Sequence, residues 1–132
     1  MDYTWYPVYD RIVSQIDELL AKEKNRQVTV AIDGMCGSGK STLGQALKDH
    51  YGCNLFHMDD FYLRMEQRTP ERYAEPGGNV DYERFQAEVL KQLENKDGFS
   101  YQLFSCATFS LSDFVAVSWN RLNIVELSLI HI

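Results

Sequence analysis

A glycine-rich segment constrains the fold of this 132-residue chain more than any other feature of its sequence. Residues 34–41 read Gly-Met-Cys-Gly-Ser-Gly-Lys-Ser and match the pattern G-x-x-x-x-G-K-[ST] at every fixed position. The residues before it, Gln27–Asp33, form a β-branched run, and Thr42–His50 after it has helical spacing. A strand, a glycine loop and a helix in this order predict an α/β fold whose loop binds phosphate.

Each fixed position of this loop has a physical task. The glycines allow the backbone to turn its N–H groups toward an anion, and the following helix offers its positive N-terminal end. Lys40 supplies charge to the β- and γ-phosphates, and the Ser41 hydroxyl is suited to ligate Mg²⁺. The predicted cofactors are therefore ATP and Mg²⁺. The predicted nucleotide-binding residues are Gly34, Gly37, Ser38, Gly39, Lys40, Ser41 and Thr42.

Composition excludes several other classes of protein. Thirteen basic against nineteen acidic residues give a net charge of −6 without a basic run, which argues against a nucleic-acid partner. No run of 18 apolar residues occurs, so we expect no membrane span. The three cysteines (Cys36, Cys53, Cys106) have no metal-type spacing and favour reduced thiols in the cytoplasm. The length and the 45% hydrophobic content fit one domain over residues 1–132.

The rest of the chain alternates helical and extended patterns. Helices are predicted at Pro7–Lys24 and Asp81–Asn95, and strands at Asn54–Met58 and Leu122–Leu127. Between the second predicted strand and the second of these helices, residues 59–79 are rich in charge, Pro and Gly and predict an irregular excursion. Residues 99–117 predict only short strands. This alternation predicts a parallel sheet with helices on both faces.

Two further segments indicate a family. The segments are His57-Met58-Asp59-Asp60-Phe61-Tyr62 and the run Pro76–Phe85, which contains Gly77-Gly78-Asn79-Val80-Asp81. With the glycine loop, they make the chain resemble the uridine kinase-like branch of the P-loop kinases, which includes phosphoribulokinase. The resemblance covers roughly Val28–Glu126. It implies a P-loop NTPase-type sheet and an ATP-dependent kinase that transfers the γ-phosphoryl group to a hydroxyl of a small metabolite.

The resemblance also implies roles for individual residues. Asp59 matches the position of the family's catalytic carboxylate, and Lys40 would take part in catalysis with it. Asp60 and Glu126 would hold Mg²⁺ with Ser41, although Leu127 stands where the family has a glycine. Asp81 and Tyr62 would contact the acceptor. Other interpretations stay open: the Asp59–Asp60 pair as turn caps, Glu126 as a solvated strand end, and Asp81 as a helix N-cap.

Two features bear on the acceptor. Arg64, Arg68 and Arg72 recur every four residues, which predicts one helical face, either solvated or directed toward a phosphorylated acceptor. The family recognises a pyrimidine base through hydrogen bonds from a Tyr and a His, and this chain has Phe104 and Phe109 at those positions. Because phenylalanine cannot form these hydrogen bonds, we expect the acceptor to be a small alcohol other than uridine or cytidine.

Two other classes of function compete with the kinase. One is a nucleotide-binding module or inactive fragment that binds ATP without phosphoryl transfer; the other is an interaction protein with a relic loop, which would bind no nucleotide. The chain stops six residues after Glu126. We therefore expect a sheet that is incomplete at the C-terminus, without the lid and last elements of the family, and a poorly active chain. The acceptor, the oligomeric state and the preference for ATP over GTP are open.

Overall fold

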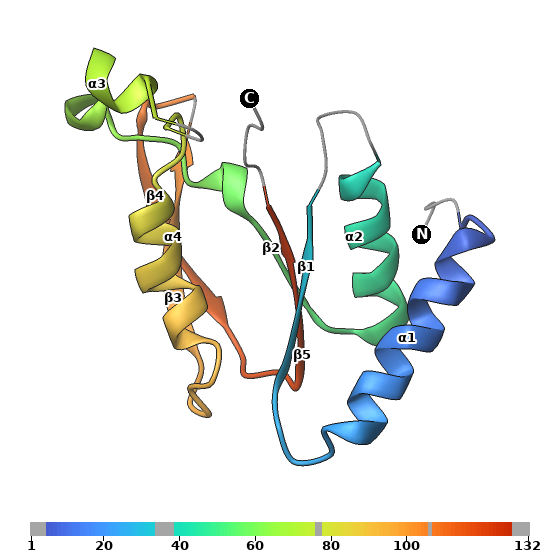
Figure 1. Ribbon diagram of the computed structural model, residues 1–132. Helices are drawn as coiled ribbons and strands as arrows, with labels where there is room; N and C mark the ends of the chain where they lie inside the picture. The colour runs from blue at the N-terminus through green and yellow to red at the C-terminus, as the bar shows by residue number, and fades with distance from the viewer. Residues whose placement is uncertain (1–4, 34–38, 76–77, 106, 128–132) are drawn as a thin grey trace. The chain divides into compact units, whose positions relative to one another are not determined.

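The computed structural model describes residues 5–33, 39–75, 78–105 and 107–127. The chain divides into two compact units (Figure 1). The phosphate-loop unit contains Met1–Phe56 and Asn120–Glu126, and the second unit contains His57–Trp119 and Leu127–Ile132. Over the described ranges, no helix is both long and apolar enough to cross a membrane. The single-domain organisation of residues 1–132 stays a prediction.

The phosphate-loop unit is built on a three-stranded sheet with the order β1-β5-β2. β1 (Val28–Ile32) runs parallel to β5 (Leu122–Glu126), in a register from Val28↔Leu122 to Ile32↔Glu126. β2 (Asn54–His57) lies on the other side of β5, where the Asn54 side-chain amide donates to Asn123 Oδ1 at 3.0 Å. All five residues of β5 are buried, as expected for a central strand.

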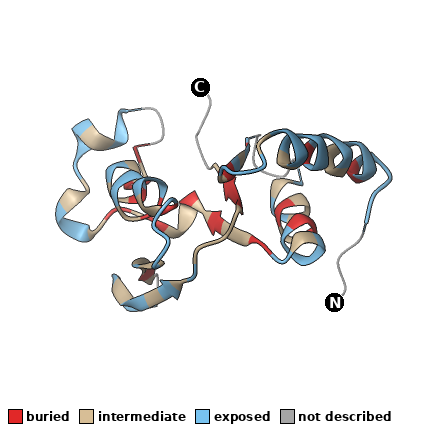
Figure 2. Ribbon diagram, turned by 90° about the horizontal axis from the view of Figure 1, so that it is seen from below, coloured by how far each residue is buried: buried red, intermediate tan, exposed pale blue. Residues whose placement is uncertain are grey.

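Two helices pack on this sheet. α1 (Val8–Lys22) and α2 (Lys40–Tyr51) lie side by side and contribute Ile16 and Leu47 to a core with Val28, Ile32, Leu122 and Ile124. The Tyr51 hydroxyl joins the two helices by donating to Val13 O at 3.2 Å and Asp17 Oδ1 at 2.8 Å. Figure 2 shows buried positions gathered along the strands, whereas most of α1 is exposed.

The second unit combines short helical turns with an antiparallel hairpin. β3 (Phe99–Ser105) and β4 (Ser110–Val117) pair from Phe99↔Val117 to Ser105↔Ser110, with an irregularity between Gln102 and Phe104. Its buried side chains include Phe61, Leu63, Val80, Phe85 and Val89. The helical elements are η1 (Met58–Asp60), η2 (Met65–Gln67), α3 (Pro70–Tyr73), α4 (Tyr82–Glu88) and η3 (Leu90–Gln92).

The structure confirms the predicted α/β class and the parallel sheet, and it changes some details. The helix predicted over Asp81–Asn95 is shorter, because α4 ends at Glu88 and a 3₁₀ turn follows. The segment 59–79 is less irregular than predicted, since it contains three short helical turns. Residues 99–117, predicted to form only short strands, form one hairpin of two longer strands.

Candidate phosphate-binding site

The glycine loop meets helix α2 at Gly39. Three of the predicted nucleotide-binding residues, Gly34, Gly37 and Ser38, lie outside the described residues. Gly39 is the N-cap of α2 with φ 91°, a left-handed conformation that strains any residue with a Cβ atom. A glycine N-cap has no side chain to accept from the first-turn amides. The helix begins at Lys40 without an acidic residue in its first turn, which favours an anion at this end.

A hydrogen bond connects the start of α2 to the end of β5. Ser41 Oγ donates to Glu126 Oε1 at 2.9 Å, although the two residues are 85 positions apart in sequence. Glu126 is 4% exposed. Because β5 runs parallel to β1, its carboxyl end reaches the same sheet edge as the glycine loop. The structure thus brings together two of the three predicted metal ligands.

This pair of oxygen ligands fits magnesium. Mg²⁺ prefers hard oxygen ligands and keeps several waters, so one or two protein groups plus phosphate oxygens suffice to hold it. A hydroxyl and a carboxylate at hydrogen-bond distance provide such groups. Within the part of the chain that the structure describes, no cluster of three or more His, Cys, Asp or Glu side chains is placed to hold a metal by itself.

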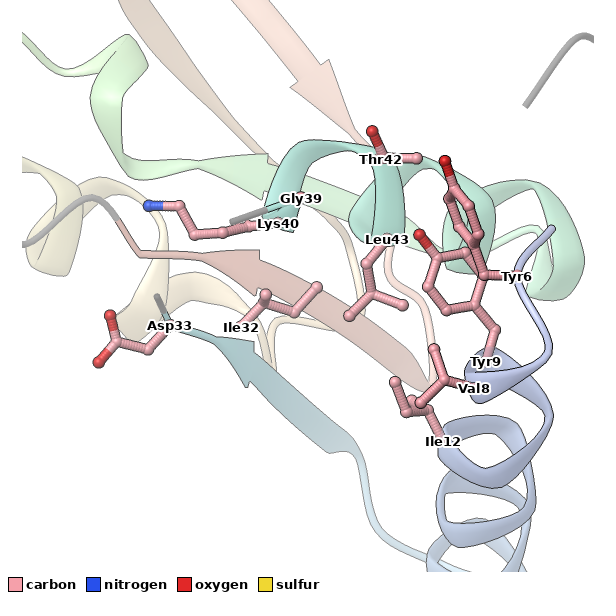
Figure 3. A pocket seen from close by; sticks show the side chains of 10 residues that line it. All are labelled: Tyr6, Val8, Tyr9, Ile12, Ile32, Asp33, Gly39, Lys40, Thr42 and Leu43. Carbon is pink, nitrogen blue, oxygen red and sulfur yellow. The ribbon is translucent and has the colours of Figure 1, made fainter. Parts of the chain in front are cut away.

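A pocket of about 560 Å³ lies beside the start of α2. Lys40 and Thr42, both predicted to bind nucleotide, line it together with Gly39. Figure 3 shows Lys40 and Asp33 at one end of the pocket and the rings of Tyr6 and Tyr9 at the other. The pocket therefore extends from the predicted phosphate-binding residues along α1.

The contribution of α1 and the residues before it to this pocket was not predicted from the sequence. Tyr6, Val8, Tyr9 and Ile12 line it; Val8, Tyr9 and Ile12 belong to α1, and Tyr6 lies two residues before the helix begins. The available signal was the aromatic cluster Trp5-Tyr6 with Tyr9, which is unusual for the start of a helix that only packs on a sheet. The helical spacing of the apolar residues indicated only that this segment packs against the rest of the fold.

The predicted catalytic carboxylates lie in the second unit. Asp59 and Asp60 form the short turn η1 that follows β2, and both are half-buried. Burial raises the pKa of the Tyr101 hydroxyl, and the charge of Asp60 adds to that effect. Tyr62 is half-buried and forms an antiparallel bridge with Val80, which connects the two segments that carry the resemblance. The roles of Asp59, Asp60 and Tyr62 stay predictions.

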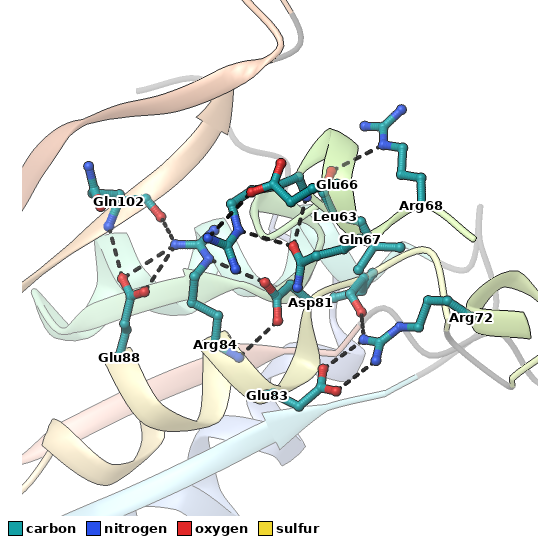
Figure 4. A network of polar contacts seen from close by, with 12 residues as sticks. Leu63, Glu66, Gln67, Arg68, Arg72, Asp81, Glu83, Arg84, Glu88 and Gln102 are labelled. Atoms are coloured by element: carbon teal, nitrogen blue, oxygen red, sulfur yellow. Dashed lines mark hydrogen bonds and ion pairs between the residues drawn. The ribbon is translucent and has the colours of Figure 1, made fainter.

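Asp81 occupies the position expected of a helix N-cap. Its carboxylate accepts from the Arg84 backbone N–H at 3.1 Å, and its Oδ2 lies 3.6 Å from Arg84 Nε. Asp81 is 2% exposed, and Oδ2 has no hydrogen-bond partner. Arg84 also donates to Gln102 O at 2.8 Å and to Glu88 at 3.3 Å (Figure 4). The N-cap interpretation is thus observed, and the acceptor role of Asp81 stays a prediction.

The three regularly spaced arginines do not share a helical face, so that prediction was wrong. Arg64 contacts Gln67, and Arg68 donates to Leu63 O at 3.2 Å with its guanidinium over the Phe104 ring. Arg72 donates to both carboxylate oxygens of Glu83 at 2.7 Å (Figure 4). The chain turns between η2 and α3, so the spacing of four never becomes one helix.

Sequence comparison finds two kinases. No protein-family model matches the chain. It is 26% identical to a probable gluconokinase from Dictyostelium discoideum over 90 residues, which are 64% of this chain and 44% of the relative. It is 34% identical to a bifunctional shikimate kinase/3-dehydroquinate synthase from Thermotoga maritima over 64 residues, which are 48% of this chain and 13% of the relative. The chain spans less than half the length of either relative.

Structural comparison finds kinases as well. A possible uridine kinase from Bacillus stearothermophilus superposes with a TM-score of 0.69 at 22% identity, covering 92% of this chain and 71% of the other. Its fold is that of the P-loop kinases. D-glycerate 3-kinase from Cryptococcus neoformans shares the fold with a TM-score of 0.68 at 19% identity, over 92% of this chain and 52% of that kinase.

Proposed function

We propose that this chain is the part of an ATP-dependent kinase that binds Mg·ATP and directs its γ-phosphoryl group to a hydroxyl of a small metabolite. The hydrogen bond between Ser41 and Glu126 carries the proposal. A buried carboxylate is costly unless it is paired, and one of the partners of Glu126 is the Ser41 hydroxyl, which the motif assigns to Mg²⁺. A glycine turn without a ligand has no need of this pair.

The roles of the residues follow from charge. The start of α2 and the Lys40 ammonium would hold the β- and γ-phosphates, and Ser41 and Glu126 would hold Mg²⁺. When bound, Mg²⁺ neutralises charge on the phosphate oxygens. Asp59 would accept the proton of the acceptor hydroxyl. The acceptor oxygen then bonds to the γ-phosphorus, the bond to the bridging oxygen of ADP breaks, and the proton remains on the carboxylate.

The acceptor class is supported by the names of the similar proteins. These names specify gluconate, shikimate, glycerate and uridine as the molecules phosphorylated. All four carry several hydroxyl groups, so we propose a small polyhydroxylated acceptor. Phe104 is buried under the Arg68 guanidinium and offers no hydrogen bond to a pyrimidine, which disfavours uridine.

The buried free thiol of Cys53 supports a cytoplasmic setting.

An ADP-release assay on the purified chain tests this proposal. Gluconate, glycerate, shikimate, uridine, pantothenate and sugar alcohols are offered with Mg·ATP, and slow but acceptor-dependent ADP release is expected with at least one of them. Calorimetry measures Mg·ATP affinity in parallel. Lys40→Ala should weaken it about 10- to 100-fold, because a charge-assisted phosphate contact is lost. Lys48→Ala is the matched control, since it removes an exposed lysine from the last turn of the same helix.

Two results would contradict the proposal. Equal Mg·ATP affinity in the Lys40→Ala and Lys48→Ala variants would show that Lys40 does not contact the phosphates, and the proposed phosphate site would then be wrong. ATP binding without acceptor-dependent ADP release would instead support a nucleotide-binding module.

A further inference from the structure

The pocket beside α2 has two chemically different ends. At one end lie the Lys40 ammonium and the Asp33 carboxylate, and at the other lie the rings of Tyr6 and Tyr9 (Figure 3). Apolar side chains of Ile32 and Leu43 lie between the two ends. The volume of about 560 Å³ lies within the range of pockets that enclose small ligands. A ligand that fills it must combine a charged part with a flat or apolar part.

The aromatic end is held in place by ring contacts. Tyr9 is 6% exposed, and the rings of Trp5 and Tyr6 meet it edge-on at 5.3 and 5.5 Å between centroids. Trp5 Nε1 also donates to Asp10 Oδ1 at 3.0 Å. Tyr6, in contrast, is 49% exposed although it lines the pocket. A fixed ring therefore supports a second ring that presents much of its surface to a ligand.

The spacing of the two ends is fixed as well. Tyr9 belongs to the first turn of α1 and Tyr6 lies two residues before it, whereas the predicted phosphate-binding residues Lys40 and Thr42 belong to the start of α2. The Tyr51 hydroxyl, on α2, bonds to Val13 O and Asp17 on α1, and Ile16 packs in the shared core. A site with a fixed spacing selects a ligand whose two parts are separated by a matching distance.

We infer that this pocket binds the purine base of the nucleoside triphosphate, with the base stacked on Tyr6 and the phosphates at Lys40. The inference rests on the proposed function and adds the recognition of the base. A nucleotide has an anionic end and a flat aromatic end, as the pocket requires. Stacking on an aromatic side chain is favourable for any base, and a purine covers more of the ring than a pyrimidine does. Thr42 lies between the two ends, near the Tyr6 ring (Figure 3).

Calorimetry with two ligands separates the base from the phosphates. Mg·ATP and magnesium tripolyphosphate are titrated into the unchanged chain and into Tyr6→Ala, Tyr6→Phe and Tyr73→Ala. Tyr6→Ala should weaken ATP binding about tenfold, as loss of a base stack does, and leave tripolyphosphate binding unchanged. Tyr6→Phe keeps the ring and should retain ATP affinity. Tyr73→Ala is the matched control, because Tyr73 is 52% exposed and belongs to the second unit.

The remaining outcomes distinguish the two proposals. If tripolyphosphate binds but Tyr6→Ala leaves ATP affinity unchanged, the base site is wrong and the phosphate site stands. If CTP binds as tightly as ATP, the purine assignment is overturned. If neither ATP nor tripolyphosphate binds to the unchanged chain, the proposed function fails and the base site fails with it. Circular dichroism of each variant checks that a loss of affinity does not result from a loss of folded structure.

Discussion

The two units hold their polar side chains by different means. In the phosphate-loop unit, Ser41 and Glu126 meet because a helix begins and a strand ends at the same sheet edge. Backbone pairing over five residues of β1 and β5 fixes that geometry. In the second unit, Asp81 pairs with Arg84, and Arg84 is placed by side-chain contacts with Glu88 and the Gln102 carbonyl (Figure 4) and by the Phe61 ring beneath its guanidinium.

This difference predicts how each unit responds to substitution. Where the backbone places a side chain, its removal changes chemistry and leaves the fold intact. Where side chains place one another in a buried network, removal of one leaves another without its partner, and the fold itself loses free energy. Substitutions of side chains that the backbone places and of side chains that hold one another should therefore separate activity from stability.

The largest effect is expected for Asp59, which lies in the second unit but on the turn that directly follows β2, so the backbone places it much as the end of β5 places Glu126. Asp59→Asn should lower acceptor-dependent phosphoryl transfer about 10²- to 10⁴-fold, because it removes the proposed base, and it should leave Mg·ATP affinity unchanged. The ADP-release assay and calorimetry measure the two quantities. Asp113→Asn, at an exposed position of β4, controls for the loss of charge. If Asp60→Asn abolishes transfer and Asp59→Asn does not, the base is one residue further along the chain.

A smaller effect, on stability, is expected for Arg84. The side chains of Arg84 and Asp81 are 10% and 3% exposed, so Arg84→Met leaves a carboxylate buried without its cation. The free energy of unfolding should fall by about 3–5 kcal/mol. Urea unfolding followed by Trp119 fluorescence in a Trp5→Phe background reports on the second unit, which contains Trp119.

Two further variants sharpen this test. Adding Asp81→Asn to Arg84→Met should recover part of the loss, because asparagine keeps the N-cap and removes the buried charge. Arg26→Met, at a side chain 79% exposed, should change stability by no more than about 0.5 kcal/mol. A loss below about 1 kcal/mol for Arg84→Met would mean that the network does not hold the second unit together.

The phosphate-loop unit was largely predictable from sequence. Its signals are local: the loop motif is contiguous, β1 is β-branched, and β5 is an apolar run that ends in a carboxylate. The rule that parallel strands present their carboxyl ends at one edge then places Ser41 near Glu126. The Tyr6 side of the pocket could not be predicted, because it depends on where α1 packs against α2.

The second unit was less predictable because its structure depends on contacts distant in sequence. The hairpin lacks a clean polar–apolar alternation, since most residues of β3 and β4 are half-buried or exposed. Its connection includes Phe109 at φ 52°, where a glycine or asparagine would have marked the turn. Arg72 forms its ion pair with Glu83, eleven residues away, which no helical spacing indicates.

The smallest effect is expected at that ion pair, and it depends on pH. Hydrogen bonds from Arg72 lower the pKa of Glu83, so the pair stabilises the fold above the ordinary pKa of glutamate and loses its contribution as pH falls through the lowered value. Glu83 is 58% exposed at its side chain, and solvent screening limits the contribution to about 0.5–1 kcal/mol. Glu83→Gln should therefore reduce the free energy of unfolding by that amount at pH 7, and the difference from the unchanged chain should shrink toward pH 3. Urea unfolding at both pH values measures this, with the exposed Glu94→Gln as the control. A difference that stays constant with pH would mean that Glu83 acts through its uncharged contacts, in which case the second unit would not depend on this ion pair.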